Sequence, residues 1–328
     1  MATTAAVPAP TGMHKYQSST VTLYQIRGPS TLLAQRHAQD RPACLEVGPP
    51  TPTDTDRLSR QCPPGSRTSA SVPPTLVRFD ISDLRSKAVT CRLIALCIDA
   101  MDPIRLSQFW AGVLGWETPA TSDDIISLLP NDDTGFRIDF APTLEPKACP
   151  NQMHFDLTST SIEDQRQKVA RALRLGAQHI DIGQRAEEGH VVLADPEGNE
   201  FCVIEPGNEF LADCGFIGAI ACDGSQEVGY FWSEALGWPL VWDHDQETAI
   251  RSPRGGPKIT WGGPPLPQKT GKYRLHFDIA PPRHGDQRAE VERLISLGAT
   301  RIDIGQGEVS WVVMADPDGH EFCVLTPR

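Results

Sequence analysis

The stretch HFDL at residues 154–157, followed by ADPEGNEFCV at residues 194–203, decides the fold because the chain contains it twice. The second copy reads HFDI at residues 276–279 and ADPDGHEFCV at residues 315–324. The first motif recurs after 122 residues (154 to 276) and the second after 121 (194 to 315), so the spacing is kept apart from one deletion. A repeat of this length corresponds to a whole small domain rather than to a solenoid unit.

Shorter motifs between and before these two keep the same spacing. They are Trp110 with LGW at 114–116 and Trp232 with LGW at 236–238, LGA at 175–177 and 297–299, and IDIG at 180–183 and 302–305. We therefore predict two homologous domains, at residues 89–207 and 214–328.

Residues 1–88 precede the first domain and are rich in Pro, Ser, Thr and Gly. They contain no apolar periodicity long enough to bury one face, so we expect a disordered extension. The opening MATTAAVPAPTG has two prolines and no basic residue, which is unlike a secretory signal peptide.

Composition excludes several classes of partner. The formal net charge is -12 and there is no cluster of Lys and Arg, which argues against a nucleic-acid surface. No segment approaches the 18 or more apolar residues of a membrane span. The nine cysteines include no C-x-x-C pair, which disfavours zinc ribbons and disulfide scaffolds. We expect a cytoplasmic protein.

Each domain is expected to have an α+β fold with the order βαβββ twice. A strand at residues 93–98 is followed by a helix that Pro103 can open, because the first helical turn does not need its N–H. A second helix is expected to begin after Ser161, with Asp164 completing a capping box, and to stop at Gly176. Residues 195–198 form the turn of the closing hairpin.

Alternation along the HFDL strand indicates which side chains share a face. Phe155 and its apolar neighbours point one way, whereas His154 and Asp156 point the other. The apolar face should meet the helices, so the polar face should line a concave side. His276 and Asp278 repeat this pattern.

These motifs resemble the glyoxalase-like domains of the vicinal oxygen chelate superfamily, which includes bleomycin-resistance proteins and extradiol dioxygenases. The resemblance covers residues 90–206 and 215–328. It implies paired βαβββ modules that curve around clefts, four modules in two tandem domains.

The resemblance also implies where a metal would bind. Metal-dependent members place a His, a Glu, a second His and a second Glu at four points of each cleft. Alignment on the LGW and DPEG motifs puts Ala95, Asp139, His154 and Cys202 there in the first domain, and Ile217, Trp261, His276 and Cys323 in the second. Ala and Ile cannot donate to a cation, so we expect a degraded metal site in both domains. Asp139, His154 and Cys202 of the first domain could still bind a metal as an irregular triad.

Other interpretations of these residues stay open. Each His could bind a metal, contact a ligand as a general base beside its carboxylate, or hydrogen-bond within the cleft. Cys202 and Cys323 lack a basic neighbour in sequence, which favours small buried residues. Trp242, Trp261 and Trp311 could stack on a ligand or pack in the core.

We therefore expect a small-molecule-binding glyoxalase-like protein of the sequestering or resistance type, without a cofactor. The expected ligand-binding residues are His154, Asp156, Asp139, Cys202, His276, Asp278, Trp261, Trp311 and Cys323. The fused domains could form a pseudo-dimer within one chain. The alternative is a metal-dependent lyase, isomerase or dioxygenase that acts through the first domain.

Overall fold

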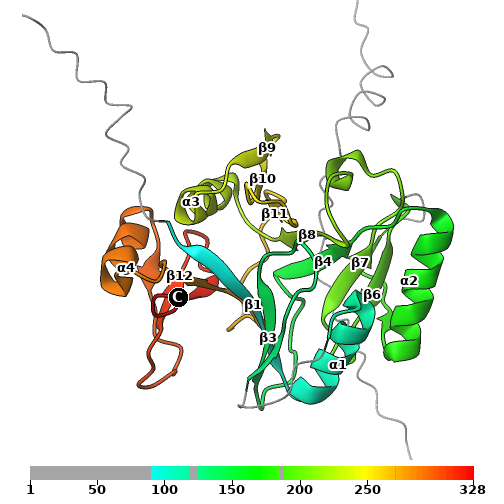
Figure 1. Cartoon of the computed structure of the whole chain (residues 1–328), viewed down its shortest axis with the longest axis horizontal. Helices are drawn as coiled ribbons and strands as arrows, with labels where there is room; N and C mark the ends of the chain where they lie inside the picture. The colour runs from blue at the N-terminus through cyan, green and yellow to red at the C-terminus, as the bar shows by residue number, and fades with distance from the viewer. Residues whose placement is uncertain (1–89, 118–124, 185–187, 270) are drawn as a thin grey trace, which may run out of the picture. The chain divides into compact units, whose positions relative to one another are not determined.

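The computed structural model describes residues 90–117, 125–184, 188–269 and 271–328, which belong to one compact unit (Figure 1). The extension expected at residues 1–88 lies outside the described residues. Within the described ranges, no helix is long and apolar enough to cross a membrane.

Each repeat consists of two successive modules, and each module begins with a strand and a helix. The first repeat contains β1 (Arg92–Ala100), α1 (Pro103–Leu114), β2 (Ile126–Leu128), β3 (Arg137–Pro142), β4 (Met153–Leu157), α2 (Ile162–Leu175), β5 (Gln178–His179), β6 (Val191–Ala194) and β7 (Glu200–Val203). The second contains β8 (Ile217–Cys222), α3 (Gln226–Leu236), β9 (Leu240–His244), β10 (Glu247–Arg251), β11 (Lys258–Trp261), β12 (Leu275–Ala280), α4 (Gln287–Ser296), β13 (Thr300–Arg301), β14 (Val312–Ala315) and β15 (Glu321–Val324). The α+β class is confirmed, and three modules have the predicted βαβββ order. In the first module, the described residues contain two strands after the helix.

Each of the two sheets takes strands from both repeats. Sheet A has the order β13-β14-β15-β12-β1-β3-β2, and sheet B has the order β5-β6-β7-β4-β8-β11-β10-β9. In Figure 1, β1 lies between β12 and β3, with which it forms ladders. The predicted assignment of one cleft to each repeat is therefore wrong. Each sheet combines one module of the first repeat with one module of the second.

Helix boundaries follow the capping residues that the sequence contains. Asp102 caps α1 by accepting a hydrogen bond from the Arg105 N–H at 3.0 Å, and Pro103 occupies the first turn. Gly115 ends the helix with φ of 74°, a left-handed conformation in which glycine avoids the strain of a Cβ atom. The predicted start of this helix at Pro103 is confirmed.

The core of the first repeat is centred on Trp110 of α1, which is 1% exposed. Its ring meets Phe155 of β4 edge-on at 5.0 Å and Phe201 of β7 at 5.1 Å, and its Nε1 donates to Asp195 at 3.1 Å. The apolar side of the HFDL strand therefore meets the helix, as alternation predicts. Asp195 was expected only to shape a turn, but it also anchors the core tryptophan.

The second repeat has the same core. Trp232 of α3 packs edge-on against Phe277 at 5.3 Å and Phe322 at 5.1 Å, and its Nε1 donates to Asp316 at 3.1 Å. Because Phe277 points toward α3, its neighbours His276 and Asp278 point to the other side of sheet A.

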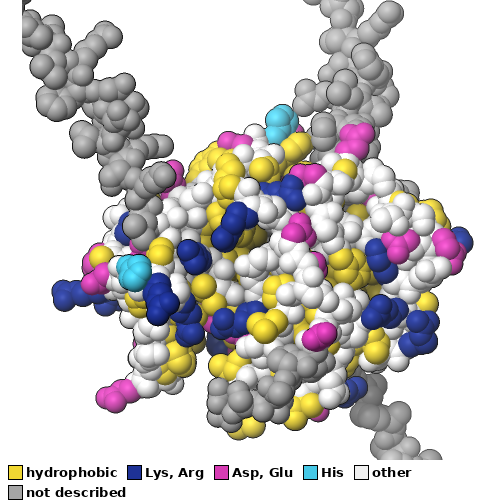
Figure 2. Space-filling model, in the orientation of Figure 1, with side chains coloured by type: hydrophobic (Ala, Val, Ile, Leu, Met, Phe, Trp, Pro, Cys, Tyr) yellow, Lys and Arg dark blue, Asp and Glu magenta, His cyan; other side chains and the backbone are white. Residues whose placement is uncertain are grey.

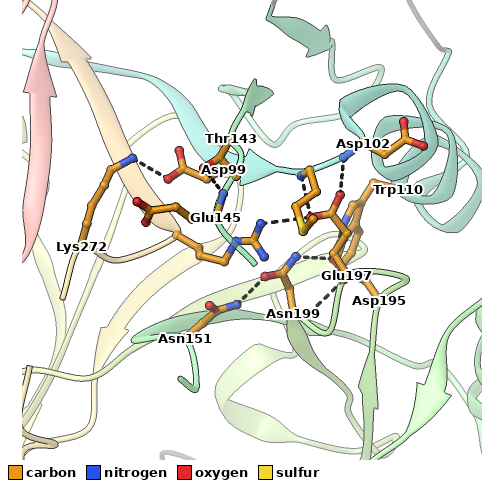
Figure 3. Close-up of polar contacts among 12 residues, drawn as sticks. Asp99, Asp102, Trp110, Thr143, Glu145, Asn151, Asp195, Glu197, Asn199 and Lys272 are labelled. Atoms are coloured by element: carbon orange, nitrogen blue, oxygen red, sulfur yellow. Dashed lines mark hydrogen bonds and ion pairs between the residues drawn. The ribbon is translucent and has the colours of Figure 1, made fainter. Parts of the chain in front are cut away.

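A partly buried carboxylate at the start of α1 ties the two repeats together (Figure 3). Glu197, in the DPEG turn, accepts hydrogen bonds from the Met101 N–H at 2.9 Å and the Asp102 N–H at 2.8 Å, at the start of α1. It also pairs with Arg274, which directly precedes β12, at 3.1 Å. The DPEG motif therefore connects α1 of the first repeat to the start of β12 in the second repeat.

Candidate functional site

Two rows of side chains cross the face of sheet A that is turned away from α3. The histidine row is Asp139, Cys97 and His276, which lie side by side on β3, β1 and β12. The arginine row is Arg137, Ala95, Asp278 and Cys323, on β3, β1, β12 and β15. Residues directly opposite one another in neighbouring strands share a face, so both rows lie on one surface, which we call the open face.

Sheet B has two corresponding rows. Thr260, Ala221 and His154 replace the histidine row, and Lys258, Ala219, Asp156 and Cys202 replace the arginine row. The two sheets share the His, the Asp and the last Cys. Only sheet A has a carboxylate and a thiol opposite its histidine.

The register changes the grouping that alignment on sequence motifs predicts. Asp139 lies with His276 in sheet A, so the expected triad of Asp139, His154 and Cys202 is not formed. Its counterpart in sheet B is Thr260, one residue before Trp261. A slip of one residue turns a side chain to the opposite face of a sheet.

Trp261 is accordingly not a wall of the cleft. It is 1% exposed and belongs to the hydrophobic core, where its ring lies close to Gly224 and near the start of α3. Cys97 was overlooked because it has no cysteine at the equivalent repeat position. Pairing of β1 with β12 places it beside His276, and this pairing cannot be read from the repeat spacing alone.

The open face of sheet A borders a cavity of about 400 Å³. Both rows contribute to it through Arg137, Asp139, Cys97, His276, Asp278 and Cys323. Its apolar lining includes Val313, Leu325, Ile304 and Trp311, and Trp311 is 37% exposed. On the face turned to the viewer in Figure 2, Lys and Arg side chains lie beside hydrophobic ones. A pocket with a few convergent polar groups on an apolar floor is typical of small-molecule sites.

His276 is the central polar group of this cavity. Its Nε2 lies 3.4 Å from Asp278 Oδ1, and its buried Nδ1 has no hydrogen-bond partner among the described residues. Burial acts to lower the pKa of His276, but the Cys97 thiol and the Asp278 carboxyl beside it outweigh burial and raise the pKa well above its usual value. The side chain can therefore carry a proton into the cavity near neutral pH.

The remaining polar groups of the open face are held by neighbours. The Arg137 guanidinium binds both oxygens of Asp139, with Nε to Oδ1 at 2.8 Å and Nη2 to Oδ2 at 2.7 Å, and Ser127 donates to Oδ1 at 2.6 Å. Burial raises the pKa of the Cys97 and Cys323 thiols, against the opposing effect of His276.

The equivalent face of sheet B is covered by the chain itself. The connecting segment, residues 208–213, joins the repeats and includes a short 3-10 helix at Glu209–Leu211. Leu211 is buried against Val192, Cys202 and Ile204, and Phe210 packs against the same cluster. His154 and Asp156 are 7% and 8% exposed. The chain therefore lies over this part of sheet B, whereas the open face of sheet A borders the cavity.

A larger hollow of about 800 Å³ lies on the helical side of the first repeat. It is bordered by the end of α1, by α2 and by residues 214–216, and much of its wall consists of exposed α2 side chains such as Arg171 and Arg174. None of the predicted site residues lines it, so we do not assign the functional site there.

Known proteins agree with this architecture. The family model of the glyoxalase-like domain matches the sequence at residues 95–204 and again at residues 218–325. The chain belongs to the glyoxalase-like domain family, with two copies in tandem. No curated protein matches the sequence.

Solved structures show the same fold at low sequence identity. Glyoxalase I from Zea mays is similar with a TM-score of 0.51 and 13% identity, over 72% of this chain and 92% of the maize chain. A single-residue mutant of the maize enzyme gives 0.51 and 14%, over 73% and 94%. At this identity the likeness establishes the fold and leaves the activity open.

The potential metal ligands on sheet A are poorly suited to bind the metal ion that metal-dependent members of the superfamily use. His276, Asp278 and Cys323 have potential ligand atoms within 4.8 Å of one another. However, the Asp139 carboxylate is already held by Arg137, whose fixed positive charge would oppose a cation. A thiol must also lose its proton to bind a metal, whereas burial raises the pKa of both nearby thiols.

Proposed function

We propose that this glyoxalase-like protein binds a small organic molecule in the cavity on sheet A, in a sequestering role. The observation that supports this most strongly is the difference between the two sheets. The same sheet surface is built twice, and the chain covers one copy while the other borders a cavity of about 400 Å³. This volume lies within the range of about 300–1,000 Å³ found for small-molecule sites.

The cavity offers a distinct role to each kind of side chain. Trp311 presents a partly exposed ring on which an apolar or planar group could stack. His276 supplies an unpartnered Nδ1, and Arg137 supplies N–H groups that Asp139 does not use. The ligand would therefore have an apolar part above the floor and a polar part toward the two rows.

The alternative function is metal-dependent catalysis, expected to act through the first domain. It is favoured by two groups of potential ligands, each with its ligand atoms within 4.8 Å of one another: His154, Asp156 and Cys202 on sheet B, and His276, Asp278 and Cys323 on sheet A. Elemental analysis of protein purified without chelator distinguishes the alternatives. One equivalent of a transition metal per chain, lost in His276→Ala, would support the enzyme.

The binding proposal is tested by thermal shift with a panel of small organic molecules. Compounds that stabilise the protein should lose their effect in Trp311→Ala, because its ring lines the cavity. They should keep it in Asp156→Asn, which changes the covered face of sheet B. A panel in which no compound acts, or in which Asp156→Asn alone abolishes the shift, would refute the proposal.

A further inference from the structure

The segment that covers sheet B indicates what the open face of sheet A binds. Its apolar part is Phe210 and Leu211, which lie over Val192, Cys202 and Ile204. Phe210 also meets the Trp242 ring edge-on at 5.9 Å. The sheet surface therefore accommodates an aromatic and a branched aliphatic group together.

The same segment offers oxygen atoms to two cations of the sheet, Lys258 and Arg251. Lys258 of β11 donates to the Phe210 carbonyl oxygen and lies 2.8 Å from Asp213 Oδ1. Its Nζ also lies 4.5 Å from the centre of the Phe210 ring. Arg251 binds the second carboxylate oxygen of Asp213 and, at 2.6 Å, its carbonyl oxygen. The occupant of sheet B is thus an apolar body with a carboxylate.

Sheet A has the same apolar floor. The residues that form it in sheet B are Val192, Cys202, Ile204 and Ile180, and their repeat counterparts in sheet A are Val313, Cys323, Leu325 and Ile302. In sheet B this floor is covered by Leu211, whereas in sheet A it borders the cavity through Val313, Cys323 and Leu325.

Sheet A also has a cation at the matching position. Arg137 lies opposite Ala95 as Lys258 lies opposite Ala219. Arg137 binds Asp139 through Nε and Nη2, which leaves Nη1 without a hydrogen bond among the described residues. A guanidinium carries five N–H donors, so it can bind a second carboxylate while it holds the first.

Three of the four acidic residues of the cavity are paired with a basic side chain: Asp139 with Arg137, Asp99 with Lys272 at 2.5 Å, and Glu321 with Lys269 at 2.6 Å. The fourth, Asp278, lies 3.4 Å from His276 and forms an ion pair with it when the imidazole is protonated. Arg328 also lines the cavity and has no ion-pair partner among the described residues. The lining therefore contains cationic N–H groups that can accept a carboxylate.

We propose that the cavity on sheet A binds a small organic acid, with its aromatic or branched apolar body over the Val313 and Leu325 floor beside Trp311 and its carboxylate on Arg137. The acid takes the place that Phe210, Leu211 and Asp213 occupy on sheet B. This inference rests on the proposed function and narrows the ligand to one chemical class.

The test compares two acids with their neutral analogues on the full chain. 3-Phenylpropanoate and 4-methylpentanoate are titrated calorimetrically beside 3-phenylpropanamide and 4-methylpentanamide. Each acid should bind about 10-fold or more tightly than its amide, because hydrogen bonds to charged groups are worth about 1.5–3 kcal/mol. Arg137→Gln should abolish this preference, and Arg137→Lys should retain part of it because sheet B uses a lysine there. Arg254→Gln, which removes an exposed Arg outside the cavity, should leave the preference unchanged.

Three results would overturn the inference. Equal affinity for acids and amides would leave a small-molecule site standing without a carboxylate preference. An acid preference that survives in Arg137→Gln, with the melting temperature of the variant unchanged, would place the carboxylate elsewhere. Failure of both acids to bind would exclude this ligand class, and the wider thermal-shift panel would then decide the proposed function separately.

Discussion

The division of sheet A into a core side and a cavity side is tested by replacing one aromatic residue from each. Phe277 is 2% exposed and packs edge-on against Trp232 at 5.3 Å. Removing a buried Phe side chain costs about 3–5 kcal/mol. The lost aromatic contact, worth about 0.5–1.5 kcal/mol, favours the upper part of that range. We therefore expect Phe277→Ala to lower the free energy of unfolding by about 4 kcal/mol.

Trp311→Ala is the matched control on the cavity side. Because this ring is 37% exposed and lines the cavity, its loss should cost about 1 kcal/mol or less. Phe155→Ala, at the equivalent core position of sheet B, should resemble Phe277→Ala. The assay is denaturant unfolding, with midpoints compared at constant slope. A cost below about 1 kcal/mol for Phe277→Ala, or a larger cost for Trp311→Ala, would refute the assignment of the two sides.

Three further predictions concern charge. Burial raises the pKa of Asp223 from 3.8 to about 6, so the stability of the folded state relative to the Asp223→Asn variant is greatest below about pH 4 and is lost as the pH rises through 6. Between pH 4 and pH 7.5 the free energy of unfolding of the wild type should fall by roughly 1–3 kcal/mol relative to that of Asp223→Asn. A difference between the two proteins that stays constant with pH would contradict the shifted pKa. Glu197→Ala leaves the largely buried Arg274 without its carboxylate and should lower the free energy of unfolding by about 3 kcal/mol. Asp318→Ala removes hydrogen bonds to Ser225 at the equivalent turn of the second repeat and should cost less, as denaturant unfolding of both variants would show. Protein purified without chelator should carry far less than one metal per chain, and EDTA should leave its melting temperature unchanged, whereas a drop of several degrees would show a structural or catalytic ion.

Local features were predictable from sequence because each depends on a few neighbouring residues. Pro103 marked the start of α1, because the first helical turn does not need its N–H. Alternation along β4 separated Phe155 from His154, and the contact of Phe155 with Trp110 confirms it. The repeated motifs indicated the tandem domains, which the two family matches confirm.

Pairing between distant strands was not predictable from these local signals. Two tandem domains can each close their own sheet or exchange modules, and both arrangements bury the same apolar faces. The exchange decides that Asp139 belongs with His276 rather than with His154. The predicted orientation of Trp261 was wrong. A constant repeat spacing of 122 residues aligns Trp261 with Asp139, whereas the strand pairing makes Thr260, one residue earlier, the counterpart of Asp139.

Closure of one cleft also could not be inferred from sequence. The connecting segment reads as an ordinary short linker, and only the folded chain brings Phe210 and Asp213 to Lys258. The asymmetry between two closely similar sheet faces is therefore a property of the tertiary structure.

A crystal structure of the full chain with the compound that gives the largest thermal shift tests most directly whether sheet A holds the ligand site. We expect density for the compound between Arg137 and Trp311, with residues 208–213 still covering sheet B. Density over sheet B in place of Phe210, or only in the hollow beside α2, would contradict the assignment of the site to sheet A.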